Sequence, residues 1–141
     1  MFKNVLLAID LTEPTSWARA LPVALELCKA SSGRLHVVTV AAEVNMQVAS
    51  FFPEDANERL LGHAKSELGA WVGKHVPAGV AVDAIVRQGS IHREIIATAE
   101  QVGADVIVMA SHKPAIRDYV LGANAAHVVR HAACSVMVVR G

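Results

Sequence analysis

The sequence predicts an α/β protein built on one parallel β-sheet with helices on both faces. Short, almost continuously apolar segments alternate along the chain with longer segments in which apolar residues recur at helical spacing. This alternation is typical of repeated strand–helix–strand units, whose right-handed crossovers make successive strands parallel. The short segments carry apolar residues at consecutive positions, as expected for strands that helices cover on both faces.

The first predicted strand and helix lie within residues 1–33. The segment NVLLAI (4–9) is almost continuously apolar and predicts a buried strand. In the segment 14–33, apolar residues recur every three or four positions, and Gly33 suits the end of a helix. Pro22 lies inside this predicted helix. Because an internal proline removes a backbone hydrogen bond, we expect the helix to bend there.

The rest of the chain continues this alternation as far as its last strand. Ser90 is a residue type that caps the start of a helix and Gly103 a type that ends one, so a helix is predicted between them. No internal repeat, linker or low-complexity segment interrupts the order, and residues 1–141 are expected to form one domain. The remaining predicted elements are strand 34–42, loop 43–53, helix 54–76, strand 80–89, helix 91–103, strand 104–110, helix 122–133 and strand 135–140.

Composition and charge exclude several classes of protein. Hydrophobic residues make up 53% of the 141 residues and charged residues 18%, a balance that excludes intrinsic disorder. The formal net charge is +0, so no overall field attracts nucleic acid or an anionic membrane, and neither is an expected partner. No apolar run approaches the roughly 20 residues that a membrane-spanning helix needs.

The two cysteines and the N-terminus indicate a cellular location. Cys28 and Cys134 form no CxxC pair and lie in apolar contexts, as buried thiols of a cytosolic protein do. Residues 1–10 suit a strand better than a secretory signal, because no small-residue cleavage site follows them. The expected location is therefore the cytoplasm.

Candidate binding residues lie at the carboxyl ends of the first and fourth predicted strands. In an open parallel sheet, a ligand binds beyond the carboxyl ends of the strands, where the strand order reverses. If these two strands are neighbours across the reversal, Asp10 faces the segment 110–124 across one crevice. The residues at the two ends are Ala8, Ile9 and Asp10 on the first strand and Met109, Ala110 and Ser111 on the fourth.

The residue types around this crevice suit a nucleotide. Gly122 opens a predicted helix, whose free N–H groups and positive dipole end attract phosphate. Lys113 and Arg117 would add charge-assisted hydrogen bonds. Val40 and Met109 would flank a base with apolar side chains. A single glycine before a helix occurs in many proteins, so the pattern by itself is a weak signal of phosphate binding.

Two residues of the crevice have alternative, structural roles. Asp10 would accept hydrogen bonds from ribose hydroxyls, or it would cap the next helix near Thr12 and Ser16. His112 would contact a phosphate, or it would order its own loop through a bond to the backbone. The sequence leaves both pairs of alternatives open.

Other conspicuous residues favour structural roles. His127 and His131 lie four residues apart on one helix, but two ligands do not make a metal site, and a solvated or dimer-facing pair is favoured. Trp17 and Trp71 lie on apolar helical stripes and are expected in the core. The pair Phe51–Phe52 in the predicted loop would cover either the mouth of the pocket or a partner surface.

Three stretches resemble the universal stress protein family, and the match runs nearly end to end. They are NVLLAID, QGSIHREIIATAEQVGADVIVMASH and LGANAAHVVRHAACSVMVVR. The stretch SHKPAIRDYVLGANAAHVVRHA is similar to the bacterial single-domain branch whose loop reads Ser-His-Arg-Pro. The resemblance implies a five-stranded parallel sheet ordered 3-2-1-4-5, which is Rossmann-like and of the adenine nucleotide alpha hydrolase-like type. It also implies a homodimer and, in one part of the family, ATP bound in the crevice.

The nucleotide-binding motif of the family is only partly present. It consists of Gly, two residues, Gly, nine residues, Gly, and then Ser or Thr. This sequence has Ala110, two residues, Lys113, eight residues, Gly122 and Ala123, so it keeps one glycine, lacks the hydroxyl and shortens the loop by one. Lys113 and the amide of Asn124 would compensate in part. We expect a weakened site that still accepts ATP, with or without Mg²⁺. The expected cofactor-binding residues are Ala8, Ile9, Asp10, Val40, Gly89, Met109, Ala110, Ser111, His112, Lys113, Arg117, Gly122, Ala123 and Asn124.

The sequence and the resemblance together leave three functions to compare. The first is an adenine-nucleotide-binding stress-response module, a homodimer whose ligand biases the dimer or an unidentified regulatory partner. The second is a very slow ATPase, which is disfavoured because Asp10 and Asp118 are the only carboxylates near the loop. The third is a dimeric scaffold without nucleotide. The last strand, 135–140, is apolar and lacks lysine, and the resemblance implies that this edge pairs across the dimer.

Overall fold

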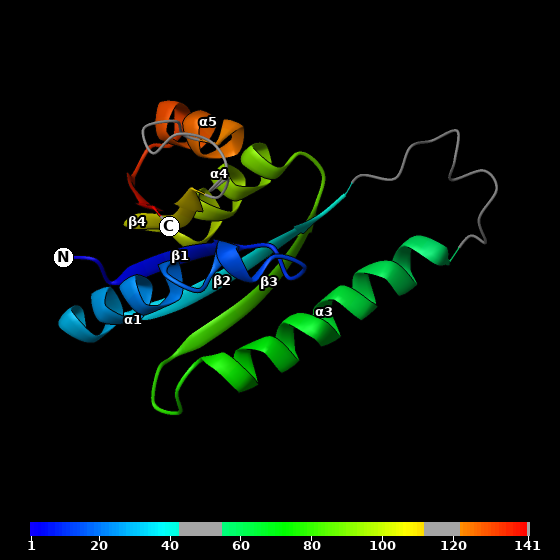
Figure 1. Cartoon of the computed structure of the whole chain (residues 1–141), viewed down its shortest axis with the longest axis horizontal. Helices are drawn as coiled ribbons and strands as arrows, with labels where there is room; N and C mark the ends of the chain where they lie inside the picture. Colours follow the sequence, from blue (N-terminus) through cyan, green and yellow to red (C-terminus); the bar gives the residue numbers. More distant parts are fainter. Residues whose placement is uncertain (43–54, 112–121, 141) are drawn as a thin grey trace.

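The computed structural model of the chain describes residues 1–42, 55–111 and 122–140 (Figure 1). Five parallel strands form one sheet in the order β3-β2-β1-β4-β5, which confirms the predicted Rossmann-like α/β class and strand order. The strands are β1 (Asn4–Ile9), β2 (Arg34–Ala41), β3 (Val82–Gln88), β4 (Val106–Ser111) and β5 (Ser135–Arg140). The helices are the short 3₁₀-helix η1 (Pro14–Ser16), α1 (Ala20–Ser31), α3 (Ala56–His75), α4 (Ile91–Val102) and α5 (Ala123–His131).

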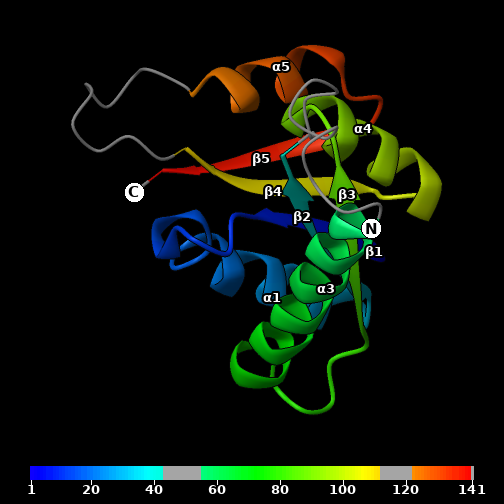
Figure 2. The same cartoon turned by 90° about the vertical axis from the view of Figure 1, so that its right-hand side faces the viewer.

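The helices form a layer on each face of the sheet, α1 and α3 on one and α4 and α5 on the other (Figure 2). The side chains of β1 alternate between these layers, as the two-residue period of a strand requires. Val5 and Leu7 pack with α1 and α3, whereas Leu6 packs with α4 and α5, and all three are fully buried. β1 therefore lies at the centre of the core, and its carboxyl end lies between the two helix layers.

The first helix begins later than the sequence predicts. The segment 14–33 is divided into η1, a turn, and α1, which begins at Ala20. Pro22 is therefore the third residue of α1. Because the N–H groups of the first turn have no partner within a helix, proline removes no hydrogen bond there. The physical reason for expecting a bend at Pro22 is therefore absent.

The glycines at the two predicted helix ends have different roles. Gly103 follows α4 with φ of 66°, the left-handed conformation of a helix end, as predicted. α1 instead ends at Ser31, and Ser32 adopts φ of 51°. A Cβ on Gly33 would lie 2.7 Å from the carbonyl oxygen of Lys3, so glycine is needed there for close approach of two backbones.

The two tryptophans link α3 to the start of α1. Trp71 is buried, as predicted, whereas Trp17 is half-buried and packs against the same core. Their rings meet edge to face with centroids 5.6 Å apart, a favoured aromatic geometry. Most of the remaining surface of α3 is exposed.

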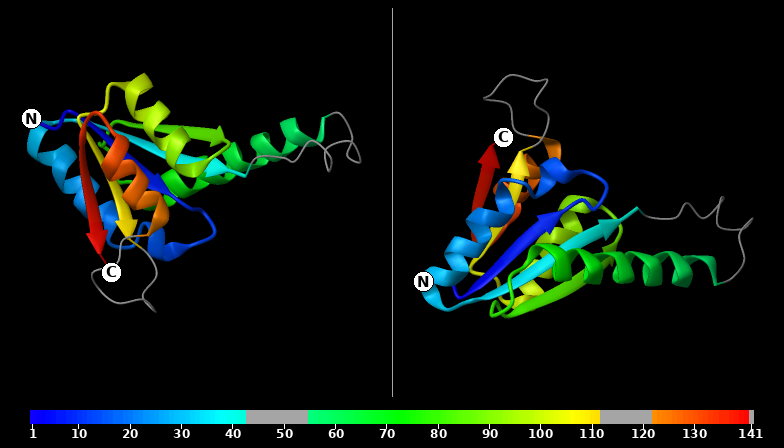
Figure 3. Two further views of the ribbon diagram at one scale, coloured as in Figure 1. Left: turned by 90° about the horizontal axis from the view of Figure 1, so that it is seen from above. Right: turned by 60° about the horizontal axis from the view of Figure 1, so that its bottom comes forward.

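The two edges of the sheet differ in character. β3 carries the charged residues Asp83 and Arg87, whereas β5 carries an exposed Met137 between half-buried valines. The arrowheads of β4 and β5 lie side by side and point the same way in Figure 3, and no other described strand pairs with β5. Among the described residues, no helix combines the length and the apolar composition that a membrane crossing requires.

Candidate functional site

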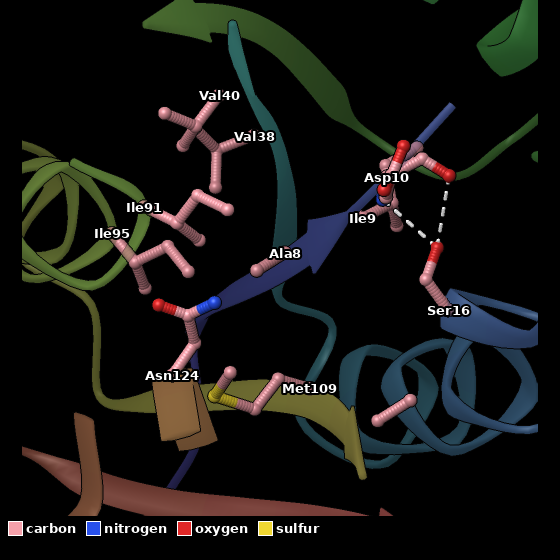
Figure 4. A pocket seen from close by; sticks show the side chains of 11 residues that line it. Ala8, Ile9, Asp10, Ser16, Val38, Val40, Ile91, Ile95, Met109 and Asn124 are labelled. Atoms are coloured by element: carbon pink, nitrogen blue, oxygen red, sulfur yellow. Dashed lines mark hydrogen bonds between the residues drawn. The ribbon is translucent and has the colours of Figure 1, made fainter. Parts of the chain in front are cut away.

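A hollow of about 160 Å³ lies between the sheet and the α4–α5 layer, at the carboxyl ends of β1, β2 and β4 (Figure 4). Because β1 and β4 are neighbours, the end of β1 and the end of β4 face the same hollow, as the sequence predicted. The residues that line it are Ala8, Ile9, Asp10, Ser16, Val38, Val40, Ile91, Ile95, Met109, Ala110 and Asn124.

The predicted site residues fall into three groups. Those that line the hollow are Ala8, Ile9, Asp10, Val40, Met109, Ala110 and Asn124. Those that the structure describes near the same edge of the sheet, without lining the hollow, are Gly89, Ser111, Gly122 and Ala123. The third group, His112, Lys113 and Arg117, lies outside the described residues. Asp118, Phe51 and Phe52, which the sequence analysis also discussed, lie outside them as well.

Four residues that line the hollow were absent from the predicted site. Val38 lies two residues before Val40 on the same face of β2, so strand alternation was a usable signal for it. Ile91 and Ile95 are separated by one helical turn of α4, but their orientation toward the sheet comes only from packing. Ser16 had been considered only as a capping partner of Asp10.

Asp10 is held by local hydrogen bonds. Its Oδ1 accepts bonds from the backbone N–H of Thr12 at 2.9 Å and from the Thr12 hydroxyl at 2.7 Å. The buried Ser16 hydroxyl accepts a bond from the Asp10 N–H and donates one to the Asp10 carbonyl oxygen (Figure 4). The structural alternative for Asp10 is thus realised as a turn rather than as a helix cap, because Glu13 precedes the first residue of η1. Oδ2 has no hydrogen bond within the described residues.

The walls of the hollow are mostly apolar. Val38 and Val40 contribute from β2 and Met109 from β4, and Met109 is only 6% exposed. Ile95 closes the inner side, and Ile91 lies at the mouth with 46% of its surface exposed. Such a slot suits a flat, largely apolar group, whose burial removes apolar surface from water.

Two helices begin at this edge of the sheet. The first N–H groups of α4 and α5 have no partner within their helices, and neither Ser90 nor Gly122 caps them through a side chain. α4 carries Glu94 in its first turn, whereas the first turn of α5 has no acidic residue. The start of α5 is therefore the better place for an anion.

Gly122 leaves the start of α5 open. Its φ of −61° suits any residue, and a Cβ built on it would meet nothing within 4 Å. Nothing in the described part of the fold requires glycine here, and the open space is what the approach of a ligand to the backbone needs.

Gly89 has a structural role beside the hollow. Its φ of 137° is a conformation that L-residues rarely adopt, and its N–H donates to the Ala41 carbonyl oxygen at 3.0 Å. The Gln88 amide also donates to Ala42 and exchanges two hydrogen bonds with Asn57 at the start of α3. These bonds fix the end of β2, and with it the wall that Val40 forms.

The titratable side chains outside the hollow form no further reactive centre in the described part of the chain. No three His, Cys, Asp or Glu side chains converge there on a point that would hold a metal ion. His127 is exposed and stacks on His92 with ring centroids 4.2 Å apart, and the exposed His131 stacks beyond it. Burial raises the pKa of the Cys28 and Cys134 thiols, which keeps both protonated and weakly nucleophilic at neutral pH.

Comparison with known proteins identifies the family. The sequence model of the universal stress protein family matches residues 1–140. Universal stress protein G of Escherichia coli O157:H7 is 30% identical over 143 residues, which cover 99% of this chain and 100% of that protein. These matches span almost the whole chain, so the matched residues include those that line the hollow.

Solved structures show the same fold. The hypothetical protein MJ0577 superposes with a TM-score of 0.74 at 25% identity, covering 100% of this chain and 97% of that one. A universal stress protein family protein from Arabidopsis thaliana, solved with AMP bound, has a TM-score of 0.65 at 20% identity, covering 98% of this chain and 91% of that one. The chain therefore belongs to the universal stress protein family.

Proposed function

We propose that this protein binds an adenine nucleotide in the hollow and acts as a homodimeric, cytoplasmic stress-response module of one domain. The observation that carries the proposal is the meeting of an apolar slot with the uncapped start of α5 at one edge of the sheet. A base and a phosphate group need these two environments side by side. The AMP-bound Arabidopsis relative supports adenine nucleotides as the ligand class.

Each part of the nucleotide has a counterpart among the described residues. The base would lie between Val40 and Met109 in the slot. Oδ2 of Asp10, which has no hydrogen bond from another described residue, would accept one from a ribose hydroxyl. The phosphate nearest the ribose would lie against the first N–H groups of α5, after Gly122.

The incomplete glycine motif sets the expected affinity. Ala110 adds one methyl group where the family motif has glycine, and Ala123 lacks the hydroxyl of the serine or threonine in the motif. A lost hydroxyl contact to a charged phosphate costs about 1–3 kcal/mol, which is roughly a 5- to 150-fold loss of affinity. Binding of ATP in particular, with or without Mg²⁺, and a compensating contact from Lys113 remain predictions.

We propose a ligand-binding role rather than turnover. Hydrolysis of a phosphoanhydride requires a positioned water and groups that hold a metal. Asp10 is the one carboxylate that lines the hollow within the described residues, and Thr12 already occupies one of its oxygens. The ligand would act by its different affinity for two states of the dimer or of a regulatory partner protein.

The dimer would form through β5. Between its end residues Ser135 and Arg140, this edge strand carries only apolar side chains, whereas β3 carries Asp83 and Arg87, and Met137 of β5 is exposed to solvent. Pairing with β5 of a second copy would give hydrogen-bond partners to the backbone groups along the outer edge of β5 and would cover Met137.

Nucleotide binding is tested on the purified protein. We expect adenine nucleotide to be released when the protein is denatured, and millimolar AMP or ATP to raise the melting temperature of the emptied protein. A ligand at a hundred times its Kd stabilises by about 2.7 kcal/mol. No released nucleotide and no shift with either ligand would contradict the proposal.

A matched pair of variants locates the binding in the hollow. Ile91 at its mouth and Val129, which does not line it, are 46% and 47% exposed. Ile91→Asp replaces an apolar wall of the slot with a charged side chain, so we expect it to weaken AMP binding. Val129→Asp makes the same change at equal exposure and should leave the affinity unchanged.

A further inference from the structure

Arg140 is the last residue of β5 and pairs in register with Ser111 at the end of β4. Side chains alternate between the two faces of a strand, so Arg140 shares its face with Val138 and Val136. Both valines pack with the α4–α5 layer. The arginine side chain therefore lies on the face of the sheet that α5 covers, at the carboxyl end of the strands.

This position adjoins the end of the hollow where we place the phosphate. Ala110, which lines the hollow, directly precedes Ser111, and neighbouring strands lie about 4.8 Å apart. The start of α5 lies over the carboxyl ends of β4 and β5 in both Figure 2 and Figure 3. The guanidinium of Arg140 and the first N–H groups of α5 are thus two sources of positive charge beside the same end of β5.

This arrangement does not serve the stability of the fold. A cation is stabilising at the C-terminal end of a helix and unfavourable at its N-terminal end. The first turn of α5 contains no acidic residue, and in the described part of the chain no carboxylate forms an ion pair with Arg140. Arg140 is exposed, so water and salt weaken the repulsion. An anion held between the guanidinium and the helix start would be attracted by both.

We propose that Arg140 binds the phosphate group of the nucleotide together with the start of α5. The proposal rests on the nucleotide-binding function proposed above and adds a residue that lies outside the glycine motif. Arginine suits this role because its planar guanidinium forms two parallel hydrogen bonds with phosphate oxygens. Since Ala123 lacks the hydroxyl of the motif, the guanidinium supplies a donor that the helix start does not have. Its effect should depend on the phosphate and not on the nucleoside.

The test compares two ligands that differ only in the phosphate group, which AMP carries and adenosine lacks. We expect Arg140→Gln to bind AMP about tenfold more weakly than the wild type, as for the loss of one hydrogen bond to a charged group, and to bind adenosine equally well. Arg140→Lys keeps the charge but not the paired donors, so its AMP affinity should lie between those of the wild type and Arg140→Gln. Isothermal titration at low salt measures these affinities.

A matched control separates a local contact from a general effect of charge. Arg130 is exposed in the last turn of α5, and Arg130→Gln makes the same change at the opposite end of the helix. It should leave the affinities for AMP and adenosine unchanged. An equal loss of AMP affinity in Arg130→Gln and Arg140→Gln would overturn the proposed contact, because position on the helix would then not matter.

The alternative role of Arg140 is structural, since a charged residue at the end of an edge strand limits unwanted pairing. If that were its only role, Arg140→Gln would bind AMP as tightly as the wild type does. This outcome would overturn the phosphate contact while leaving the nucleotide site intact. An equal loss of AMP and adenosine affinity would also overturn it, because the loss would then not depend on the phosphate. A wild-type protein that binds neither ligand would instead refute the proposed function, and this inference with it.

Discussion

Ser16 and Asp10 are joined by two hydrogen bonds at the carboxyl end of β1. The Ser16 hydroxyl accepts a bond from the Asp10 N–H at 2.8 Å and donates one to the Asp10 carbonyl oxygen at 3.0 Å. These bonds satisfy backbone groups at the point where β1 leaves the sheet. Ser16 is only 4% exposed, so water cannot easily replace its hydroxyl. The serine therefore fixes the backbone from which the Asp10 carboxylate extends.

We expect Ser16→Ala to destabilise the protein and to weaken AMP binding. The change leaves the Asp10 N–H without its partner, which costs about 1–3 kcal/mol of unfolding free energy, whereas the Asp10 carbonyl oxygen keeps its bond from the Glu13 N–H. Urea denaturation measures the stability and isothermal titration the affinity. Thr15→Ala removes a neighbouring hydroxyl that is exposed, and it should change neither quantity. Equal effects of the two variants would show that the buried hydroxyl has no special role.

The sequence predicted the sheet more accurately than it predicted the first helix. β1 and β5 were predicted at their observed bounds, because each is a short apolar run flanked by polar residues or glycine. The start of α1 was missed because the apolar period continues through Trp17, where the chain forms a turn after η1. The spacing of apolar residues does not by itself separate a 3₁₀ turn from the first turn of an α-helix. Only Pro22 pointed to a later start, because proline is tolerated in the first turn of a helix.

The site was predictable at its strand ends and less so on its helices. Residues such as Asp10 and Met109 follow from strand order, since the carboxyl ends of neighbouring parallel strands meet at one edge. Ile95 depends on the rotation of α4 about its axis, which packing decides. Asn124 was predicted at the site as a group beside the helix start, but its direction into the apolar slot was visible only in the fold.

Gly89 and Gly122 should respond in opposite ways to alanine. Gly89→Ala forces a side chain into φ of 137° and brings its Cβ within 3.3 Å of Glu94 Oε1, so we expect a loss of about 1–3 kcal/mol in stability. Gly122→Ala meets no neighbour at φ of −61° and should change stability by less than about 0.5 kcal/mol. It should nevertheless weaken AMP binding, because its methyl group occupies the open approach to α5. Urea denaturation measures the stability of both variants, and titration measures their affinity for AMP. A larger loss of stability in Gly122→Ala than in Gly89→Ala would contradict the prediction.

His36 makes the stability depend on pH. Its side chain is 6% exposed, and this burial lowers the pKa of the imidazole, against the opposing effect of the Asp83 carboxylate 3.2 Å from Nδ1. Burial prevails because Asp83 is half-exposed and also pairs with Arg34 at 2.9 Å. The unfolded chain, with a histidine pKa of about 6.5, therefore binds a proton more readily than the folded one.

The protein should thus lose stability as the pH falls below about 6.5, down to the lowered pKa of the folded state. One such group changes the unfolding free energy by at most about 1.4 kcal/mol per pH unit. Urea denaturation at pH 7.5 and pH 5.5 measures the loss, which should be smaller in His36→Gln. A pH dependence unchanged by His36→Gln would exclude His36 as its source.

The proposed dimer predicts that a charge on β5 produces monomers. Met137 is 37% exposed at the centre of β5, and Met137→Lys would bring two like charges and two buried ammonium groups into a β5–β5 interface. Light scattering coupled to size exclusion should find a dimer for the wild type and a monomer for this variant. Ala84→Lys makes the corresponding change on the opposite edge strand, β3, where Ala84 is exposed, and should leave the dimer intact. Dissociation by Ala84→Lys and not by Met137→Lys would instead assign the interface to β3.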